Sequence, residues 1–208
     1  SMTSFATILS QNGETLHNHS HHQVLTEGRL FVVDAGAENN MNYCSDFTRT
    51  MPSSGKFTQQ QKEIYNIVAA ANNLAAGYAK PGITYKEVHL EACKVLAKGL
   101  MELGLMKGNV EEAVAAGAHA LFMPHGLGHN MGLDVHDMED LGQIYVGYDD
   151  EVRPSTQFGL ASLRMGKMLH AGHVLTVEPG CYFIPALIDQ WKAEGTNKDF
   201  INFDALDA

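Results

Sequence analysis

The chain has few cysteines, no long apolar run and no signal-peptide pattern. Its 208 residues include three cysteines, Cys44, Cys93 and Cys181, which lie far apart and form no C-x-x-C pair. An odd and sparse set of this kind is typical of a reducing compartment rather than a disulfide framework. No apolar run reaches the roughly 20 residues that a membrane span needs, and the N-terminus lacks the charged-then-apolar layout of a secretory signal. We therefore expect a cytoplasmic protein with no membrane partner.

Basic side chains are also scarce. Lysine and arginine together number 14 against 24 aspartates and glutamates, which gives a formal net charge of -10. This balance argues against nucleic acid or an anionic membrane surface as a partner. Part of the negative charge can come from carboxylates that bind metals. The hydrophobic content of 45% and the charged content of 18% are those of an ordinary folded protein, and the length suits one domain.

Short apolar runs bounded by turn residues predict strands near both ends of the chain. The predicted strands cover residues 5–9, 29–33, 43–49, 120–124, 129–133, 174–178 and 181–184. The polar and turn-rich segment 147–158 is interpreted as a surface loop.

The middle of the chain has helical periodicity instead. Two pairs with capping-box form, Thr58 with Gln61 and Thr84 with Glu87, each begin a run of apolar residues at helical spacing. A third, shorter helix is expected to begin at Asn109. Strands, then helices, then strands predict an α+β domain with helices on one face of a mainly antiparallel sheet.

Three carboxylates lie in strand-like surroundings. Asp34 and Asp46 are twelve positions apart in a strand-turn-strand arrangement, so adjacent strands can bring them together. Asp34 can equally be a turn residue, whereas Asp46 interrupts an apolar strand and needs a partner if buried. Glu178 ends the apolar run of V-L-T-V-E-P-G, where it is either the first solvated residue or a buried ligand.

A histidine segment is more informative. His125 and His129 flank two glycines in H-G-L-G-H-N-M-G-L-D-V-H-D, and His136 follows in an acid-flanked triplet. The glycines indicate an irregular backbone close to a ligand; the alternative is three loop histidines bonded to the backbone. Carboxylates with one or two imidazoles suit Mn²⁺, Zn²⁺ or Co²⁺, which can make hydroxide from water at neutral pH.

Two further groups of histidines are interpreted mainly as surface residues. His17, His19, His21 and His22 form a histidine-rich tract, and such tracts are often exposed loops; among them only His17, after Leu16, has a clear strand context. His170 and His173 flank a polar turn. Neither group is assigned to the predicted metal site.

Four segments in the right order resemble the pita-bread (M24-type) metallopeptidases, most closely prolidase (Xaa-Pro dipeptidase) and the Xaa-Pro aminopeptidases. They are D-A-G-A-E with S-D-F-T-R-T, G-K-F-T-Q-Q-Q-K-E-I-Y, M-P-H-G-L-G-H with G-L-D-V-H-D, and L-T-V-E-P-G-C-Y-F-I. The resemblance covers residues 4–206. It implies a pita-bread (creatinase/aminopeptidase) fold, a curved and mainly antiparallel sheet with helices on its outer face. It also implies that residues 1–208 form a single, incomplete catalytic domain, truncated at both ends.

The resemblance implies a set of metal ligands: Asp34, Asp46, His129 and Glu178. They would hold two divalent ions bridged by a hydroxide, with Mn²⁺ as the first choice and Co²⁺ or Zn²⁺ as alternatives. Glu178 would also be the general base that moves the proton of the attacking water.

Further roles follow from the same resemblance. His125 and His136 match catalytic histidines that contact the substrate or stabilise the tetrahedral intermediate. His17 and Arg164, together with His136, match substrate-binding positions, the first two beside the carboxylate of the substrate's proline. An arginine paired with a terminal carboxylate would restrict substrates to dipeptides.

The implied reaction is hydrolysis of the Xaa-Pro bond in a small peptide with proline at the second position, most of all a dipeptide. Alternatives are an Xaa-Pro aminopeptidase acting on longer peptides and a non-catalytic pita-bread binding module. The resemblance also allows a homodimer. The sequence departs from the family in one respect that matters for activity. The family's fifth ligand, a glutamate in a later strand, has no counterpart before Ala208. We therefore expect weak binding of at least one metal by these 208 residues alone.

Overall fold

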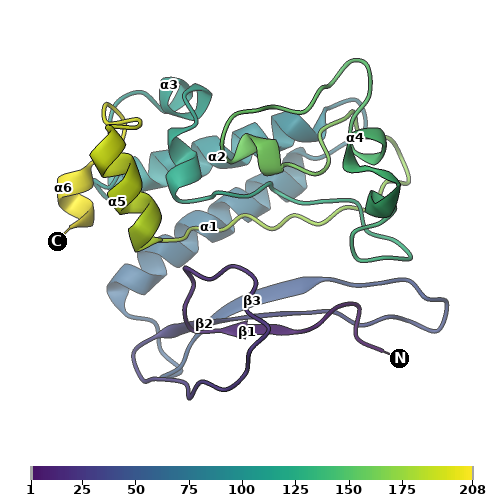
Figure 1. Ribbon diagram of the computed structural model, residues 1–208, viewed down its shortest axis with the longest axis horizontal. Helices are drawn as coiled ribbons and strands as arrows, with labels where there is room; N and C mark the ends of the chain where they lie inside the picture. Colours follow the sequence, from purple (N-terminus) through teal and green to yellow (C-terminus); the bar gives the residue numbers. More distant parts are fainter. Residues whose placement is uncertain (1, 208) are drawn as a thin grey trace.

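An antiparallel sheet forms one layer of the computed structural model, which describes residues 2–207, and helices form the other layer (Figure 1). The strands are β1 (Ile8–Ser10), β2 (Leu30–Ala35) and β3 (Phe47–Pro52), in the spatial order β1-β2-β3. The central strand pairs Asp34 with Ile8 on one side and with Thr48 on the other. The predictions of an α+β domain and of antiparallel strands near the N-terminus are confirmed.

The helical layer is built mainly from two long helices, α1 (Gln59–Tyr78) and α2 (Tyr85–Glu102). The shorter helices follow along the chain: α3 (Val110–Ala115), the 3-10 helices η1 (Ala118–Leu121) and η2 (Glu139–Leu141), α4 (Gln143–Val146), the 3-10 helix η3 (Leu160–Ser162), α5 (Pro185–Glu194) and α6 (Phe203–Leu206). None of the helices within residues 2–207 has the length and apolar content that crossing a bilayer requires.

Both long helices begin where the capping pairs predict. The Thr58 hydroxyl accepts a hydrogen bond from the Gln61 backbone N–H, and the Gln61 side chain accepts one from the Thr58 backbone N–H. Thr84 and Glu87 form the same reciprocal pair at the start of α2. Each box satisfies two N–H groups that a helix N-terminus leaves without intrahelical partners, which fixes where the helix begins. The Asn109 side chain accepts from the Glu112 backbone N–H and caps α3.

The hydrophobic core lies around α2. One cluster packs the C-terminal half of α2 against α3, η1 and α5, and the other packs its N-terminal half against α1 and the loop segments that follow η1. The fully buried positions of α2 recur every three or four residues: Tyr85, Val88, His89, Ala92, Cys93, Leu96, Ala97 and Leu100. Among these residues, His89 and Cys93 lie on the face of α2 that meets His119 of η1.

The strand predictions for the second half of the chain are wrong. Residues 118–121 form the 3-10 helix η1, because this alanine-rich segment is buried beneath α2 rather than paired with a strand. Segments 129–133 and 174–178 do run side by side, but they form an isolated bridge, Asn130 with Leu175, flanked by backbone hydrogen bonds, and not a strand ladder. Segment 181–184 is joined to another segment by the backbone bond from Tyr182 N to Phe122 O, and Pro185 then begins α5. The predicted loop at 147–158 is confirmed, with Gly147 and Tyr148 buried at its start.

Candidate metal centre

The two aspartates lie at the same end of the sheet. Asp34 is on the central strand β2, and Asp46 immediately precedes β3, whose first residue pairs with Ala35. Antiparallel pairing therefore brings the carboxylates together although twelve positions separate them, as the sequence predicts.

A pair of irregular extended segments supplies the other two residues. Glu178 N donates to Leu127 O at 2.8 Å, and Thr176 N donates to His129 O at 3.0 Å. The Thr176 hydroxyl accepts from His129 N at 3.0 Å and donates to Glu178 Oε1 at 2.7 Å, so one side chain orients both site residues. Gly128 makes this approach feasible, because a Cβ there would lie 2.2 Å from Thr176 O.

Three acceptor atoms converge at the centre. His129 Nε2 lies 3.3 Å from Asp46 Oδ2 and 3.2 Å from Glu178 Oε1. His129 Nδ1 donates to Asn130 O at 2.9 Å, so a neutral ring presents the bare lone pair of Nε2 to two carboxylates. Burial lowers the pKa of His129, but the hydrogen bonds to Asp46 and Glu178 outweigh it and raise the pKa to about 10. The arrangement therefore requires a cation between these groups, either a proton or a metal ion.

Asp34 adds a third oxygen donor. Within residues 2–207 its buried Oδ1 has no hydrogen-bond partner. Burial, followed by the charge of Asp46, raises the pKa of Asp34 to about 6. An orphaned carboxylate oxygen beside a second carboxylate is costly without a cation, so the donor set of oxygens and one imidazole fits a hard divalent metal.

His136 lies next to this centre. Its ring centroid is 4.3 Å from that of His129, with the rings nearly perpendicular. Arg164 Nη1 lies 3.3 Å from His136 Nδ1 and forms an ion pair with Glu139, which anchors the guanidinium. Burial, together with the neighbouring charges of His129 and Arg164, lowers the pKa of His136, so this imidazole is neutral near pH 7.

His125 is held by two hydrogen bonds. Nδ1 donates to Gly126 O at 2.7 Å, and Nε2 accepts from the Tyr182 hydroxyl at 3.2 Å. Burial lowers the pKa of His125, which keeps the ring neutral in this arrangement. His17 is exposed but lies close enough to His125 for its charge to lower that pKa further.

Some contributing residues were not anticipated from the sequence: Thr176, Tyr182, Glu139 and Tyr85. Tyr85 is buried and its hydroxyl donates to Thr176 O at 2.5 Å, which supports the segment that carries Glu178. Thr176 has a recognisable signal, a polar residue that alternates with Glu178 in an apolar run; the others are distant in sequence. His19, His21 and His22 are exposed and lie apart from the centre, as do His170 and His173.

A cavity of about 300 Å³ opens beside His136. Its lining is mainly acidic and apolar: Ser4, Glu38, Cys44, Leu133, Asp134, Val135, His136, Glu139 and Asp140. The cavity shares His136 with the centre, so it offers room for a ligand next to the predicted metal ligands.

The sequence profile of metallopeptidase family M24 matches residues 1–200. The chain belongs to metallopeptidase family M24. Among curated relatives, the M24 chain is 39% identical over 197 residues to a probable Xaa-Pro aminopeptidase of Fusarium vanettenii, covering 95% of this chain and 40% of the relative. It is 38% identical over 186 residues to the Xaa-Pro dipeptidase of Homo sapiens, covering 88% of this chain and 36% of that enzyme.

Solved structures agree with this assignment. Proline aminopeptidase P II from Yersinia pestis is 38% identical and superposes with a TM-score of 0.72 over 87% of this M24 chain and 37% of that one. A zinc-substituted Escherichia coli aminopeptidase P in complex with product is 31% identical, with a TM-score of 0.65 over 89% and 45% of the two chains. These similarities confirm a pita-bread type of fold. The M24 chain spans 36–40% of the length of the two curated relatives above.

Proposed function

We propose that this chain provides the metal-binding part of a dinuclear peptidase that hydrolyses Xaa-Pro bonds, with dipeptides preferred over longer peptides. The observation that carries the proposal is the position of His129 Nε2 between Asp46 and Glu178, beside the unpartnered oxygen of Asp34. These are the four residues that match the family's ligand pattern. Relatives named Xaa-Pro dipeptidase and Xaa-Pro aminopeptidase support the bond specificity.

Asp34, Asp46, His129 and Glu178 would hold two divalent ions, with Mn²⁺ as the first choice and Co²⁺ or Zn²⁺ as alternatives. When bound, such ions lower the pKa of water and polarise a carbonyl group. The carboxylates neutralise the positive charge, and the Nδ1–H bond to Asn130 O keeps the Nε2 lone pair of His129 directed at the centre.

Glu178 is the candidate general base. Its Oε1 accepts a hydrogen bond from the Thr176 hydroxyl, which holds the carboxylate in one orientation toward His129. A carboxylate fixed in this way can take the proton of the attacking water and return it to the leaving amine. The Thr176 hydroxyl is thus a positioning group for the proton transfer.

His136 is the candidate donor to the developing oxyanion. Its lowered pKa keeps the imidazole neutral, and Arg164 beside Nδ1 disfavours a proton there, so the N–H would be on Nε2. A neutral imidazole with a directed N–H stabilises negative charge on the substrate without competing for metal. His125 would act through Tyr182, because its own Nε2 accepts from that hydroxyl.

Arg164 is the candidate for substrate length selection. Glu139 anchors one side of the guanidinium, and the group lies beside His136; both of these partners line the cavity. Its remaining N–H groups can pair with the terminal carboxylate of a dipeptide. The exposed His17 near His125 is the second candidate for contact with that carboxylate.

The test is proline release from Gly-Pro by the purified protein, with and without Mn²⁺, compared with release of the first residue from Gly-Pro-Ala. We expect Mn²⁺-dependent hydrolysis with Gly-Pro as the better substrate. His129→Ala should abolish it, whereas the exposed His170→Ala serves as the matched control and should keep full activity. Better hydrolysis of Gly-Pro-Ala would favour the aminopeptidase alternative. Stoichiometric Mn²⁺ binding without hydrolysis of either peptide would overturn the proposal that these residues hydrolyse Xaa-Pro bonds and would favour a binding module.

A further inference from the structure

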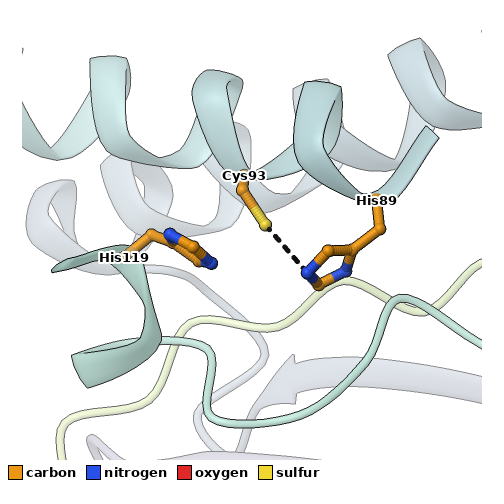
Figure 2. A group of neighbouring side chains, drawn as sticks. All are labelled: His89, Cys93 and His119. Atoms are coloured by element: carbon orange, nitrogen blue, oxygen red, sulfur yellow. Dashed lines mark hydrogen bonds between the residues drawn. The ribbon is translucent and has the colours of Figure 1, made fainter. Parts of the chain in front are cut away.

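A second group of metal-ligating side chains lies inside the helical layer. His89 and Cys93 are four residues apart on α2, so their side chains project from the same face of the helix. His119 approaches them from η1, and Figure 2 shows its ring directed toward the Cys93 sulfur. All three residues have no exposed surface, and none belongs to the centre around His129.

The polar atoms of this cluster are poorly satisfied. Within the part of the chain that the structure describes, neither ring nitrogen of His119 has a hydrogen-bond partner, nor does Nδ1 of His89. Among the described residues, the one hydrogen bond within the cluster is between Cys93 Sγ and His89 Nε2, at 3.4 Å. Buried polar atoms without partners are rare in folded proteins, because each one loses its bonds to water without compensation. Two buried histidines with unpartnered ring nitrogens, both beside a thiol, indicate a ligand.

The geometry suits a single metal ion. One donor atom from each residue lies within 4.8 Å of the other two. Metal–sulfur and metal–nitrogen bonds of about 2.3 and 2.0 Å place the two donors roughly 3.5–3.8 Å apart in tetrahedral or trigonal coordination. The His89–Cys93 pair, at 3.4 Å, is already near this separation. The donor atom of His119 lies within 4.8 Å of the other two, so its approach to bonding positions requires a shift of up to about 1 Å.

We propose that His89, Cys93 and His119 form a three-coordinate site for one soft metal ion, Cu(I). A thiolate with two imidazoles is a soft donor set, in contrast to the oxygen-rich centre around His129. Binding displaces the Cys93 thiol proton to solvent, forms one Cu–S and two Cu–N bonds, and leaves the copper oxidation state unchanged.

Charge decides between Cu(I) and Zn(II). Cu(I) with one thiolate is electrically neutral, whereas Zn(II) with the same ligands has a net charge of +1. The cluster is fully buried, and a net charge there is costly without a counter-ion. Besides burial, the neighbours that lower the pKa of His89 are His119 and His125, and no carboxylate contributes. The neutral Cu(I) complex is therefore favoured, and both histidines are available in neutral form.

The test is anaerobic titration of the purified protein with Cu(I) in competition with a chromophoric Cu(I) chelator. We expect one tightly bound equivalent. Cys93→Ser and His119→Gln should each weaken it at least about a hundredfold. Two matched controls separate the cluster from other ligands: Cys181→Ser removes another thiol, and His21→Gln removes a histidine of the exposed N-terminal tract. Both should bind Cu(I) as tightly as the parent.

Three results would overturn the proposal: no tight equivalent in the parent protein, unchanged affinity in Cys93→Ser, or tighter binding of Zn(II) than of Cu(I) at these residues. If a variant fails to fold, X-ray absorption of the Cu(I)-loaded parent protein decides. The proposal requires one sulfur and two nitrogen neighbours around copper. A shell of nitrogen and oxygen alone would reject it. None of these readouts depends on peptidase activity, so a failure here leaves the proposed peptidase unaffected.

Discussion

The centre around His129 and the cluster around Cys93 contain the same residue type in opposite electrostatic surroundings. His129 is 4% exposed and His119 is 0% exposed, so both imidazoles are desolvated. Burial alone lowers the pKa of His119 to about 4. Burial also disfavours charge on His129, yet its carboxylate partners raise the pKa to about 10. The charge of the neighbours, rather than the degree of burial, decides which histidine is cationic without metal.

This difference has a chemical consequence. The His129 centre combines one imidazole with three carboxylates and attracts a hard divalent cation, whereas the Cys93 cluster has no carboxylate and suits a soft monovalent one. The two groups lie within the same chain. Whether each group selects a different kind of metal can therefore be tested in one protein.

The largest expected effect is a reciprocal loss of metal binding. Asp46→Asn should reduce Mn²⁺ affinity at least about a hundredfold and leave Cu(I) affinity unchanged, because only the centre around His129 loses a ligand. Cys93→Ser should do the reverse. Both affinities can be measured by equilibrium dialysis with metal analysis. Loss of both metals in either variant would show that the two groups are not independent sites.

Gly128→Ala should disrupt the centre around His129, because the added Cβ does not fit between the two segments that form it. The new Cβ would lie 2.2 Å from Thr176 O and 2.7 Å from the Tyr85 hydroxyl, so the segments carrying His129 and Glu178 must separate. We expect the free energy of unfolding to fall by about 2–4 kcal/mol, measured by urea denaturation, with loss of Mn²⁺ binding.

The control for this substitution is Gly77→Ala in α1, where an added Cβ meets no atom within 4 Å. Helix propensity predicts a gain of about 0.5–1 kcal/mol there. If Gly128→Ala were as harmless as Gly77→Ala, the close approach of these segments would not be needed for the centre.

Mn²⁺ affinity should rise with pH. His129 has a folded pKa of about 10, so without metal its ring is protonated between pH 6 and 9, and binding must release that proton. Isothermal titration in buffers of different ionisation enthalpy should show about one proton released and a roughly tenfold gain in affinity per pH unit. Below about pH 6 Asp34 also takes up a proton, and the dependence should steepen. A flat profile from pH 6 to 9 would contradict the assignment of His129 as a ligand.

Asp34→Asn should give the smallest effect on stability, a gain without metal, whereas Mn²⁺ binding should weaken because a proposed ligand is lost. The raised pKa of Asp34 means that the folded state disfavours the charged form, so the carboxylate costs stability above its folded pKa of about 6. This cost is absent below the unfolded value of about 4. Without metal, the variant should be about 1 kcal/mol more stable at pH 8, after allowance for solvent screening, and equally stable at pH 3. Thermal melting at both pH values measures this difference, and lower stability at pH 8 would contradict the account.

The sequence predicts those parts of the fold that depend on local interactions. The capping boxes at Thr58 and Thr84 begin the two long helices because a helix N-terminus is satisfied by residues three positions away. The strand predictions near the N-terminus hold because each strand pairs with the next one along the chain. Segments 120–124 and 174–178 carry equally apolar residues, but their conformation depends on burial beneath α2 and on distant partners. Periodicity alone does not distinguish a buried 3-10 turn from a strand.

In the candidate site, too, the residues that depend on local motifs were predictable and those that depend on distant contacts were not. Asp34, Asp46, His129 and Glu178 could be selected from motif chemistry and family resemblance. The hydroxyls of Thr176 and Tyr85, which orient and support them, could not be selected in this way. Tyr85 is 91 positions from the carbonyl it contacts, so its role exists only in the folded chain. The Cys93 cluster was missed for the same reason, since His119 lies on a different element from His89 and Cys93.

The most direct test of the central claim is anomalous diffraction at the manganese edge from crystals of the protein grown with Mn²⁺. The account predicts an anomalous peak within bonding distance of His129 Nε2, with Asp46 and Glu178 oxygens as further ligands and Asp34 at a second peak beside it. A structure with Mn²⁺ bound elsewhere, and with His129 still hydrogen-bonded to both carboxylates at saturating Mn²⁺, would contradict it.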